Sequence, residues 1–466
     1  MIKTARWGIA AGATIAVATT FSFMTHSATA VPTHDPVSIA QLAGGSPAGA
    51  PSIVALDSNR VVIGQNEGAT SASVASVRAM TTAGVSLWST NLEMIPGAPH
   101  RVVGVGVSGT DAVVTVVAEA ADGKARTFVT RLAGSDGHAV VEGKELRSTS
   151  GGTFEAVAMG ANFSRVIVVG NGNGKFGKPK TNGDDPVVFG LTSSLDPVWM
   201  MPIAAKGDSR AVAAGYDVQT GVTAVIAEDL TKGGYSFNTV TPAGKKDVKK
   251  PLVGGPYYSV ASASDHGFYA GGEGFLSHID AKGIATSTAS LGAGNAAKSL
   301  AVGLNGIGIA GTSTNGFAGV PAIGGGDGFF GATDWNGQLL WADVLGTTAA
   351  DDTSGVTRVG ISFAVAGTTR GSIDGTTAED PNGDAYVATF DENLPMAPSV
   401  PTNLAAAGTA AGVTLTWDKS ATNSGLAVTY KVAVYDSNAG RFLPKLERML
   451  PETSGCATVC TVTWAK

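Results

Sequence analysis

Cysteine is nearly absent from the chain. Only two cysteines occur among 466 residues, and both lie close to the C-terminus. A cysteine-based metal site is therefore excluded from the long region before them. Charge is also sparse, because charged residues make up 15% of the chain and 31 lysines and arginines are outnumbered by 37 aspartates and glutamates. The resulting net charge of −6 argues against nucleic-acid binding, which depends on clustered lysine and arginine.

Motifs of catalysis and of metal binding are missing as well. The histidines after residue 30 are scattered, and none belongs to an H-E-x-x-H pair; they are His34, His100, His138, His266 and His278. The chain has no G-x-S-x-G nucleophile turn. The one basic cluster, Lys245, Lys246, Lys249 and Lys250, is interpreted as a solvated turn between strands. The sequence thus predicts no catalytic residue, no metal ligand set and no cofactor.

The only long apolar run lies at the N-terminus. Lys3 and Arg6 precede a nearly uncharged stretch from Trp7 to Phe23, and small residues follow at Ala28 and Ala30. This layout is typical of a secretory signal peptide over residues 1–30. Its removal takes the net charge from −6 to −8, because residues 1–30 hold two basic residues and no acidic one. We therefore expect a secreted, extracellular or cell-surface protein with no membrane span after cleavage.

Glycine is abundant, with 64 residues, and it punctuates a repeating pattern of short alternating strands. Seven positions serve as anchors of the repeat, with spacings between 39 and 59 residues: Val77, Val129, Val188, Phe237, Leu276, Phe330 and Val387. A glycine follows most anchors by seven or eight residues, and a tryptophan follows Val77, Val188 and Phe330 by eleven. An alanine- and valine-rich pair of strands precedes each anchor.

Each repeat therefore holds about four strands, too few to bury both faces alone. Packing the sheets radially into a closed ring removes this problem and protects the edges. We predict an all-β protein with a β-propeller over residues 37–394, with seven four-stranded blades; six or eight blades and a linear solenoid are the alternatives. The segment SIAQLAGG, from Ser38, is expected to supply a missing strand of the first unit.

The sixth and seventh repeats carry the most specific pattern. The segments DGFFGATDWNGQLLWADVLG, from Asp327, and VAGTTRGSIDGTTAEDPNGDAYVATFD, from Val365, closely resemble the short bacterial β-propeller repeat family. The resemblance implies a propeller in an exported protein. It implies no particular reaction, because propellers host many functions.

A second module follows a proline-rich linker at 395–400. Residues 401–466 resemble a fibronectin type III domain, with Leu404, Trp417 and Tyr430 in the expected strands. Val413, Leu415 and Trp417 alternate with threonines, which predicts one buried face. The segment is shorter than such sandwiches, so we predict an incomplete module; a complete short sandwich is the alternative. Cys456 and Cys460 are disulfide candidates in an exported protein.

Four acidic residues stand three positions before an anchor. Asp185, Asp327 and Asp384 end long loops in the third, sixth and seventh repeats, and Glu273 holds the same place in the fifth. Repeat symmetry places them on one face, where they are candidate ligand-binding residues, expected to be solvated. A weak Ca²⁺ site is an alternative, since that cation takes carboxylate oxygens, and turn residues are another.

These observations favour a binding protein that uses the propeller loops to hold an extracellular glycan or protein. A secreted carbohydrate-active enzyme, a glycoside hydrolase, or an accessory protein to one, is the alternative, because fibronectin-like modules accompany enzymes that degrade polysaccharides. Two carboxylates about 5–10 Å apart in a pocket would indicate the enzyme. The ligand and the oligomeric state are not determined by the sequence.

The N-terminal pattern makes a direct prediction about processing. Signal peptidase should cleave after Ala30, since small residues occupy both positions that the peptidase reads. N-terminal sequencing of the exported protein should begin at Val31. A mature chain that retains Trp7 would show that the segment is not a cleaved signal.

Overall fold

The fold is described from a computed structural model of the full chain. It divides into two compact units: Ala30–Glu392, and Met1–Thr29 together with Asn393–Lys466. The structure describes residues 5–9, 13–19, 36–42, 51–67, 73–150, 152–162, 164–176, 184–203, 207–373, 383–392, 405–409, 412–418, 429–436, 441–442, 448–451 and 459–465. Strands and turns make up this described part, and it holds no helix long and apolar enough to cross a membrane.

The larger unit consists of seven antiparallel sheets of four strands, called blades 1 to 7 here. Short runs of valine, alanine and isoleucine form the strands, and glycine-containing turns separate them. The blades are β4 (Ser52–Ala55), β5 (Arg60–Glu67), β6 (Val74–Thr81), β7 (Ser86–Leu92); β8 (His100–Ser108), β9 (Asp111–Glu119), β10 (Ala125–Leu132), β11 (Ala139–Leu146); β12 (Phe154–Ala161), β13 (Arg165–Gly172), β14 (Asp185–Thr192), β15 (Pro197–Pro202); β16 (Ser209–Tyr216), β17 (Thr223–Asp229), β18 (Tyr235–Val240), β19 (Lys246–Leu252); β20 (Tyr257–Ser262), β21 (Phe268–Gly272), β22 (Phe275–Ile279), β23 (Ala285–Ser290); β24 (Asn295–Val302), β25 (Ile307–Ser313), β26 (Asp327–Thr333), β27 (Leu339–Leu345); and β28 (Asp352–Val359), β29 (Ser362–Thr369), β30 (Asp384–Asp391), β3 (Ser38–Leu42). One parallel bridge, Arg126 to Phe154, joins blades 2 and 3 into a single sheet of eight strands.

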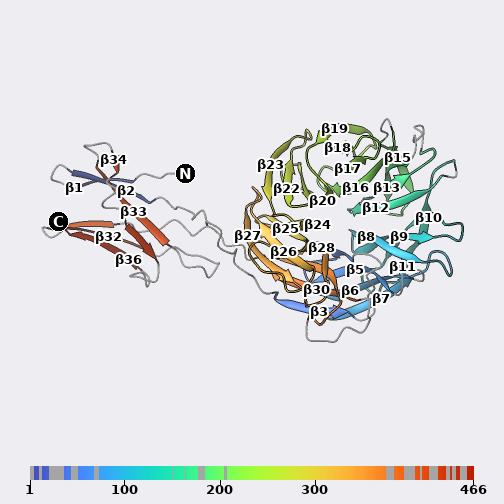
Figure 1. The fold of residues 1–466 in the computed structure, drawn as a ribbon, viewed down its shortest axis with the longest axis horizontal. Helices are drawn as coiled ribbons and strands as arrows, with labels where there is room; N and C mark the ends of the chain where they lie inside the picture. The colour runs from blue at the N-terminus through green and yellow to red at the C-terminus, as the bar shows by residue number, and fades with distance from the viewer. Residues whose placement is uncertain are drawn as a thin grey trace. The chain divides into compact units, whose positions relative to one another are not determined.

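The blades form a closed ring (Figure 1). The first strand of each blade contacts the first strands of its two neighbours, from β4 to β8 and onward to β28, which contacts β4 again. First strands are therefore innermost and fourth strands outermost. The all-β propeller with seven blades that the sequence predicts is confirmed.

One detail of the ring differs from the prediction. The segment from Ser38 does not complete the first unit, because β4 to β7 already supply all four strands of blade 1. Instead β3 pairs antiparallel with β30, from Ser38 opposite Thr389 to Leu42 opposite Ala385. The N-terminal strand thus becomes the outer strand of blade 7 and closes the ring, because the chain leaves blade 7 after its third strand.

The repeat anchors lie at equivalent places in the structure. Each anchor is on the third strand of its blade, and each is buried, with between 0% and 4% of its surface exposed. Buried apolar clusters fill the space between neighbouring blades. Between blades 6 and 7 the Phe330 ring packs 5.2 Å from Trp341, 5.5 Å from Phe363 and 4.9 Å from Phe390, measured between ring centroids. The recurring aromatic residues therefore hold blades together.

The recurring glycine also has an inter-blade role. It lies in the hairpin between the third and fourth strands with φ between 72° and 84° at Gly84, Gly137, Gly244, Gly283 and Gly337, a conformation that side chains disfavour. A Cβ at Gly137 would lie 2.5 Å from the Trp88 ring of the preceding blade. The same hairpin accepts a hydrogen bond from that ring, since Trp88 Nε1 lies 3.2 Å from the Gly134 carbonyl. In blade 3 the position is taken by Leu195, which has φ 63° and is fully buried.

The smaller unit contains two sheets. One is β31 (Ala405–Thr409), β32 (Gly412–Asp418) and β36 (Val459–Ala465); the other is β1 (Ala5–Ile9), β2 (Ala13–Thr19), β33 (Thr429–Asp436), β34 (Arg441–Phe442) and β35 (Arg448–Pro451). Leu415 and Trp417 are buried and the threonines between and before them are half-buried, so the predicted alternation is present on β32. The assignment to fibronectin type III stays a prediction.

Three sequence predictions for the ends of the chain are not tested by this unit. β2 pairs with β33 in the uncut chain, and cleavage after Ala30 would remove β1 and β2 together. The linker at 395–400 lies outside the described residues. Cys456 does too, and of Cys460 only the backbone is described, so the disulfide also stays a prediction.

The packing of the hairpin glycine predicts a measurable difference between two alanine substitutions. Gly97 has φ 73° and no atom within 4 Å of an added Cβ, so Gly97→Ala should lower the unfolding free energy only by the cost of a left-handed backbone, about 1–2 kcal/mol. Gly137→Ala should lower it by at least about 1 kcal/mol more, because the Trp88 ring must move. Denaturant unfolding of both variants gives the comparison. Equal losses would mean that the contact with Trp88 has no energetic weight.

Candidate binding surface at the propeller opening

The order of strands gives the ring two distinct faces. The connections between second and third strands, and those that lead from one blade to the next, emerge at the same end of the antiparallel strands. We call this end the loop face. The hairpins between first and second strands, and between third and fourth strands, emerge at the opposite end. On a rigid scaffold, long loops gathered at one end are where ligand contacts concentrate.

The candidate acids lie at equivalent places on the loop face. Asp185, Asp327 and Asp384 are the first residues of β14, β26 and β30, each the third strand of its blade, and Glu273 lies in the two-residue turn between β21 and β22. Of the loops before them, residues 177–183 and 374–382 lie outside the described residues. The equivalence inferred from the repeat is therefore present in the fold.

The expectation that these acids are solvated is wrong for three of the four. Asp185 and Asp327 are 0% exposed and Asp384 is 1% exposed. Burial of a carboxylate is tolerated only where hydrogen bonds replace water, and such bonds are present. Ser209 Oγ donates to Asp185 over 3.0 Å, and Gln41 Nε2 of the closing strand donates to Asp384 over 2.9 Å.

Asp327 shows what these carboxylates do in the fold. The backbone N–H groups of Ile323 and Gly324 donate to it over 2.8 and 3.2 Å, which fixes the end of the preceding loop against β26. Gly346 leaves room for the carboxylate, since a Cβ there would lie 2.3 Å from its oxygen. Glu273, in contrast, is exposed and accepts a hydrogen bond from the Tyr258 hydroxyl over 3.2 Å. Only Glu273 is open to a ligand in this conformation.

A different set of residues, on the innermost strands, surrounds the central opening at the loop face. In blades 2 to 7 the first strand contains one extra residue relative to the second strand, at Val103, Val157, Val212, Tyr258, Lys298 and Ser354. Such β-bulges redirect side chains and are common beside binding sites. Two residues before the bulge stand Arg101, Glu155, Arg210 and Asp352 in blades 2, 3, 4 and 7.

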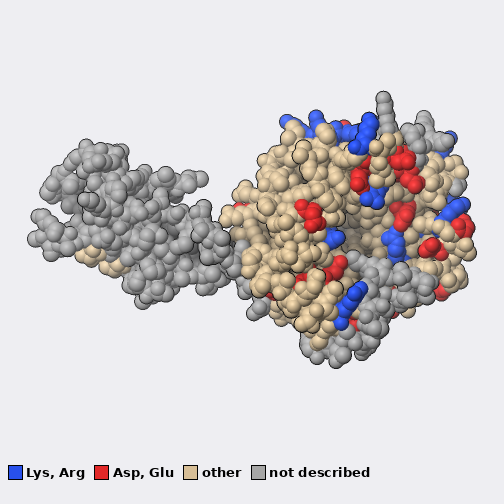
Figure 2. All heavy atoms as spheres, viewed as in Figure 1, with Lys and Arg blue, Asp and Glu red and all other residues tan. Residues whose placement is uncertain are grey.

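We call this set, with its partners, the opening cluster: Arg101, Glu155, Arg210, Glu228, Tyr258, Glu273, Lys298 and Asp352. Arg101 pairs with Glu155 of the next blade, and Arg210 Nε lies 2.7 Å from Glu228. The Lys298 ammonium lies 4.4 Å from the centre of the Tyr258 ring, a cation–π contact between blades 5 and 6. Figure 2 shows acidic and basic side chains around the hollowed centre of the ring.

The exposed pairs of the opening cluster contribute little to folding. The side chains of Arg101, Glu155 and Arg210 are 39%, 51% and 55% exposed. Ion pairs in such positions stabilise a protein by about 0–1 kcal/mol. Stability therefore does not explain why charges of both signs gather at the opening.

Asp352 differs from the other acids of the opening cluster. Burial raises the pKa of its carboxyl, and the nearby Lys298 charge opposes the rise. Its Oδ1 is buried and has no hydrogen-bond partner among the described residues. A carboxyl with a raised pKa beside an opening is a functional candidate on physical grounds.

The sequence holds a weak signal for the opening cluster. In the segments HRVV from His100, FEAV from Phe154 and SRAV from Ser209, a charged residue precedes an apolar pair near the start of the inner strand. Each charge is a single residue, separated from the next by about a whole repeat, so that no local charge pattern arises. Only closure of the ring brings these residues together.

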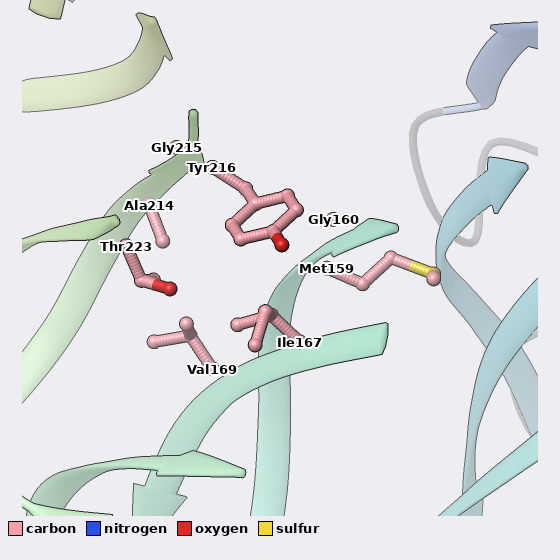
Figure 3. A pocket seen from close by; sticks show the side chains of 8 residues that line it. All are labelled: Met159, Gly160, Ile167, Val169, Ala214, Gly215, Tyr216 and Thr223. Carbon is pink, nitrogen blue, oxygen red and sulfur yellow. The ribbon is translucent and has the colours of Figure 1, made fainter. Parts of the chain in front are cut away.

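A small pocket lies apart from this surface. The pocket in Figure 3, between blades 3 and 4, has about 10 Å³ that the centre of a water-sized sphere can reach, enough for about one water molecule. Met159, Ile167, Val169 and Tyr216 line it, and Asn162 donates a hydrogen bond to the Tyr216 hydroxyl over 2.9 Å. Among the described residues, no group of three or more histidine, cysteine, aspartate or glutamate side chains is arranged to hold a metal.

The burial of Asp327 changes what its substitution should do. Asp327→Asn keeps the shape but weakens two hydrogen bonds from the backbone, so we expect a loss of about 1–3 kcal/mol of unfolding free energy. Glu273→Gln, at the equivalent exposed position, should change it by less than about 0.5 kcal/mol. Thermal and denaturant unfolding of the two variants measure this. An Asp327→Asn protein as stable as wild type would show that the carboxylate has no role in holding the loop.

No known family profile matches the chain, and no curated protein matches it. Among solved structures it is similar to the propeller of Dos1, with 8% identity over 77% of this chain and 95% of that chain and a TM-score of 0.47. It is also similar to YCF48 bound to D1 peptide, with 10% identity over 78% and 99% and a TM-score of 0.47. The WD40 domain of Neurospora crassa Pan2 matches with 14% identity over 67% and 85% and a TM-score of 0.39. The blade count above rests on strand pairing and not on these similarities.

Proposed function

We propose that this chain is an exported binding protein without catalytic activity, and that its ligand surface is the loop face around the opening cluster. The observation that carries the proposal is the gathering of half-exposed arginine, lysine, glutamate and tyrosine side chains from blades 2 to 6 at one end of the ring. The N-terminal signal pattern supports export.

The chemistry of the opening cluster favours a protein or peptide ligand. Arginine and tyrosine are enriched at protein interfaces, where they combine large contact areas with hydrogen bonding. Charges of both signs alternate around the opening, from Arg101 and Glu155 to Arg210 and Glu228. This arrangement complements a segment that itself carries basic and acidic groups, and it selects against ligands of a single charge.

Glycoside hydrolysis is the second candidate, and Asp352 is the observation that favours it. A raised pKa suits a general acid, which must be protonated at the start of the reaction. Glu155, Glu228 and Glu273 are already engaged by Arg101, Arg210 and the Tyr258 hydroxyl, which suits binding better than proton transfer.

The test compares two double variants that remove the same charge from opposite ends of the ring. Arg210→Ala with Lys298→Ala alters the opening cluster. Arg60→Ala with Arg165→Ala alters the other face, where both arginines begin second strands. The labelled full chain is applied to a peptide array, to a glycan array and to a panel of glycosidase substrates. We expect peptide binding that falls about tenfold or more in the first variant and less than about twofold in the second.

Three outcomes contradict the proposal. Equal loss in both variants would mean that the ligand does not bind at the loop face. Binding to glycans alone would show that the ligand class is wrong. Hydrolysis of a glycoside that disappears in Asp352→Asn would establish the enzyme instead. Circular dichroism and thermal unfolding confirm that each variant is folded.

A further inference from the structure

A dense lysine cluster lies on the outer rim of blade 4, away from the opening cluster. Lys245 ends the hairpin before β19, and Lys246, Lys249 and Lys250 lie on β19 itself. The interpretation of this cluster as a turn is therefore correct only for Lys245. All four lysines are exposed, and none forms an ion pair among the described residues, unlike Lys124 and Lys144.

Protection of the strand edge does not account for this cluster. Lysine on an outer strand discourages pairing with a second chain. The other six outer strands occupy the same place in their blades, yet β3, β7, β15, β23 and β27 contain no lysine and β11 contains one. That one, Lys144, is paired with Asp196 over 2.6 Å. Blade 4 thus carries positive charge that the common architecture does not need.

The lysines are placed so that they repel one another. A register shift in β19 puts Lys246 opposite Val240 and Lys249 opposite Asn238, on one face of the strand. Desolvation by the surrounding protein and the charge of Lys249 lower the pKa of Lys246, although its side chain is exposed. Lys250 lies on the other face, beside the hairpin of blade 5 that contains Gly283. A bound anion would relieve the repulsion between Lys246 and Lys249.

The cluster also stands out against the charge of the chain. Residues 245–250 hold four lysines and one aspartate, a charge of 4 − 1 = +3, so the rest of the chain sums to −6 − 3 = −9. An anionic ligand is therefore drawn to this strand and repelled elsewhere, with a range of about 8 Å at physiological salt.

We propose that β19 and the hairpin before it bind a linear acidic polysaccharide. Lysine supplies point charges that suit repeated carboxylate or sulfate groups without fixed geometry. The outer edge of a blade is extended, so a chain with repeated negative groups fits it better than a single small anion. The exposed side chains of β19 are the lysines, Asp247 and Pro251, and a single exposed valine, Val253, follows the strand, which offers little apolar area for insertion into a bilayer. This second surface is independent of the loop-face function.

The experiment measures binding of the full chain to dextran sulfate, alginate and uncharged dextran at low and high salt. We expect binding to the two acidic polymers only, and a decline as salt rises. The triple variant Lys246→Gln, Lys249→Gln, Lys250→Gln should lose about tenfold or more in affinity, and the same three positions changed to arginine should stay within about twofold. The control triple Lys124→Gln, Lys144→Gln, Lys175→Gln removes the same charge from blades 2 and 3 and should also stay within about twofold.

Several results would overturn the proposal. Equal loss in both glutamine triples would show an effect of net charge alone. Unchanged binding together with self-association of the β19 triple would show that the lysines only protect the edge. Preference for vesicles of phosphatidylglycerol and phosphatidylcholine over both polymers would assign the strand to a membrane surface, with Val253, 95% exposed just after β19, as the inserted group. Thermal unfolding excludes loss of fold as the cause.

Discussion

The pairing of β3 with β30 is the interaction on which the ring depends. Residues separated by about 350 positions form one antiparallel ladder, from Ser38 and Thr389 to Leu42 and Ala385. The Gln41 side chain bonds Asp384 within the same blade, and the Ser38 hydroxyl bonds the Thr82 carbonyl of blade 1. The entropic cost of closing a loop rises only slowly with the length of the loop. The ladder, these side-chain bonds and the apolar core between blades 7 and 1 therefore hold the ring closed.

Closure also creates the proposed binding surface. The opening cluster exists only when the first strands meet around one axis, since its members come from six different blades. The β-bulges give every inner strand but one the same local geometry, and the side chains at those places differ from blade to blade, as at Val157, Tyr258 and Lys298. A repeated backbone thus carries a non-repeated set of side chains, so specificity lies in the residues and not in the fold.

Much of the fold was predictable from sequence because it is local and repeated. The anchors, the hairpin glycines and the tryptophans are set a few residues apart within a blade, and this spacing recurs from blade to blade. Each of these residues is buried or tightly packed, as the pattern indicates. The less predictable features arise between distant residues. Burial of Asp185, Asp327 and Asp384 depends on donors outside their strands, such as Ser209 and Gln41. Leu195 replaces the hairpin glycine because its side chain fills a core between blades 2 and 3, and the place of β3 depends on ring closure.

The claim that the loop face is the ligand surface is tested most directly by hydrogen–deuterium exchange of the full chain, with and without the peptide that it retains on the array. The account predicts slower exchange in the connections between blades and in the first residues of β8, β12, β16, β20, β24 and β28 when peptide is bound. The hairpins of the opposite face should exchange as before. Protection confined to those hairpins, or to the outer strands, would contradict the account.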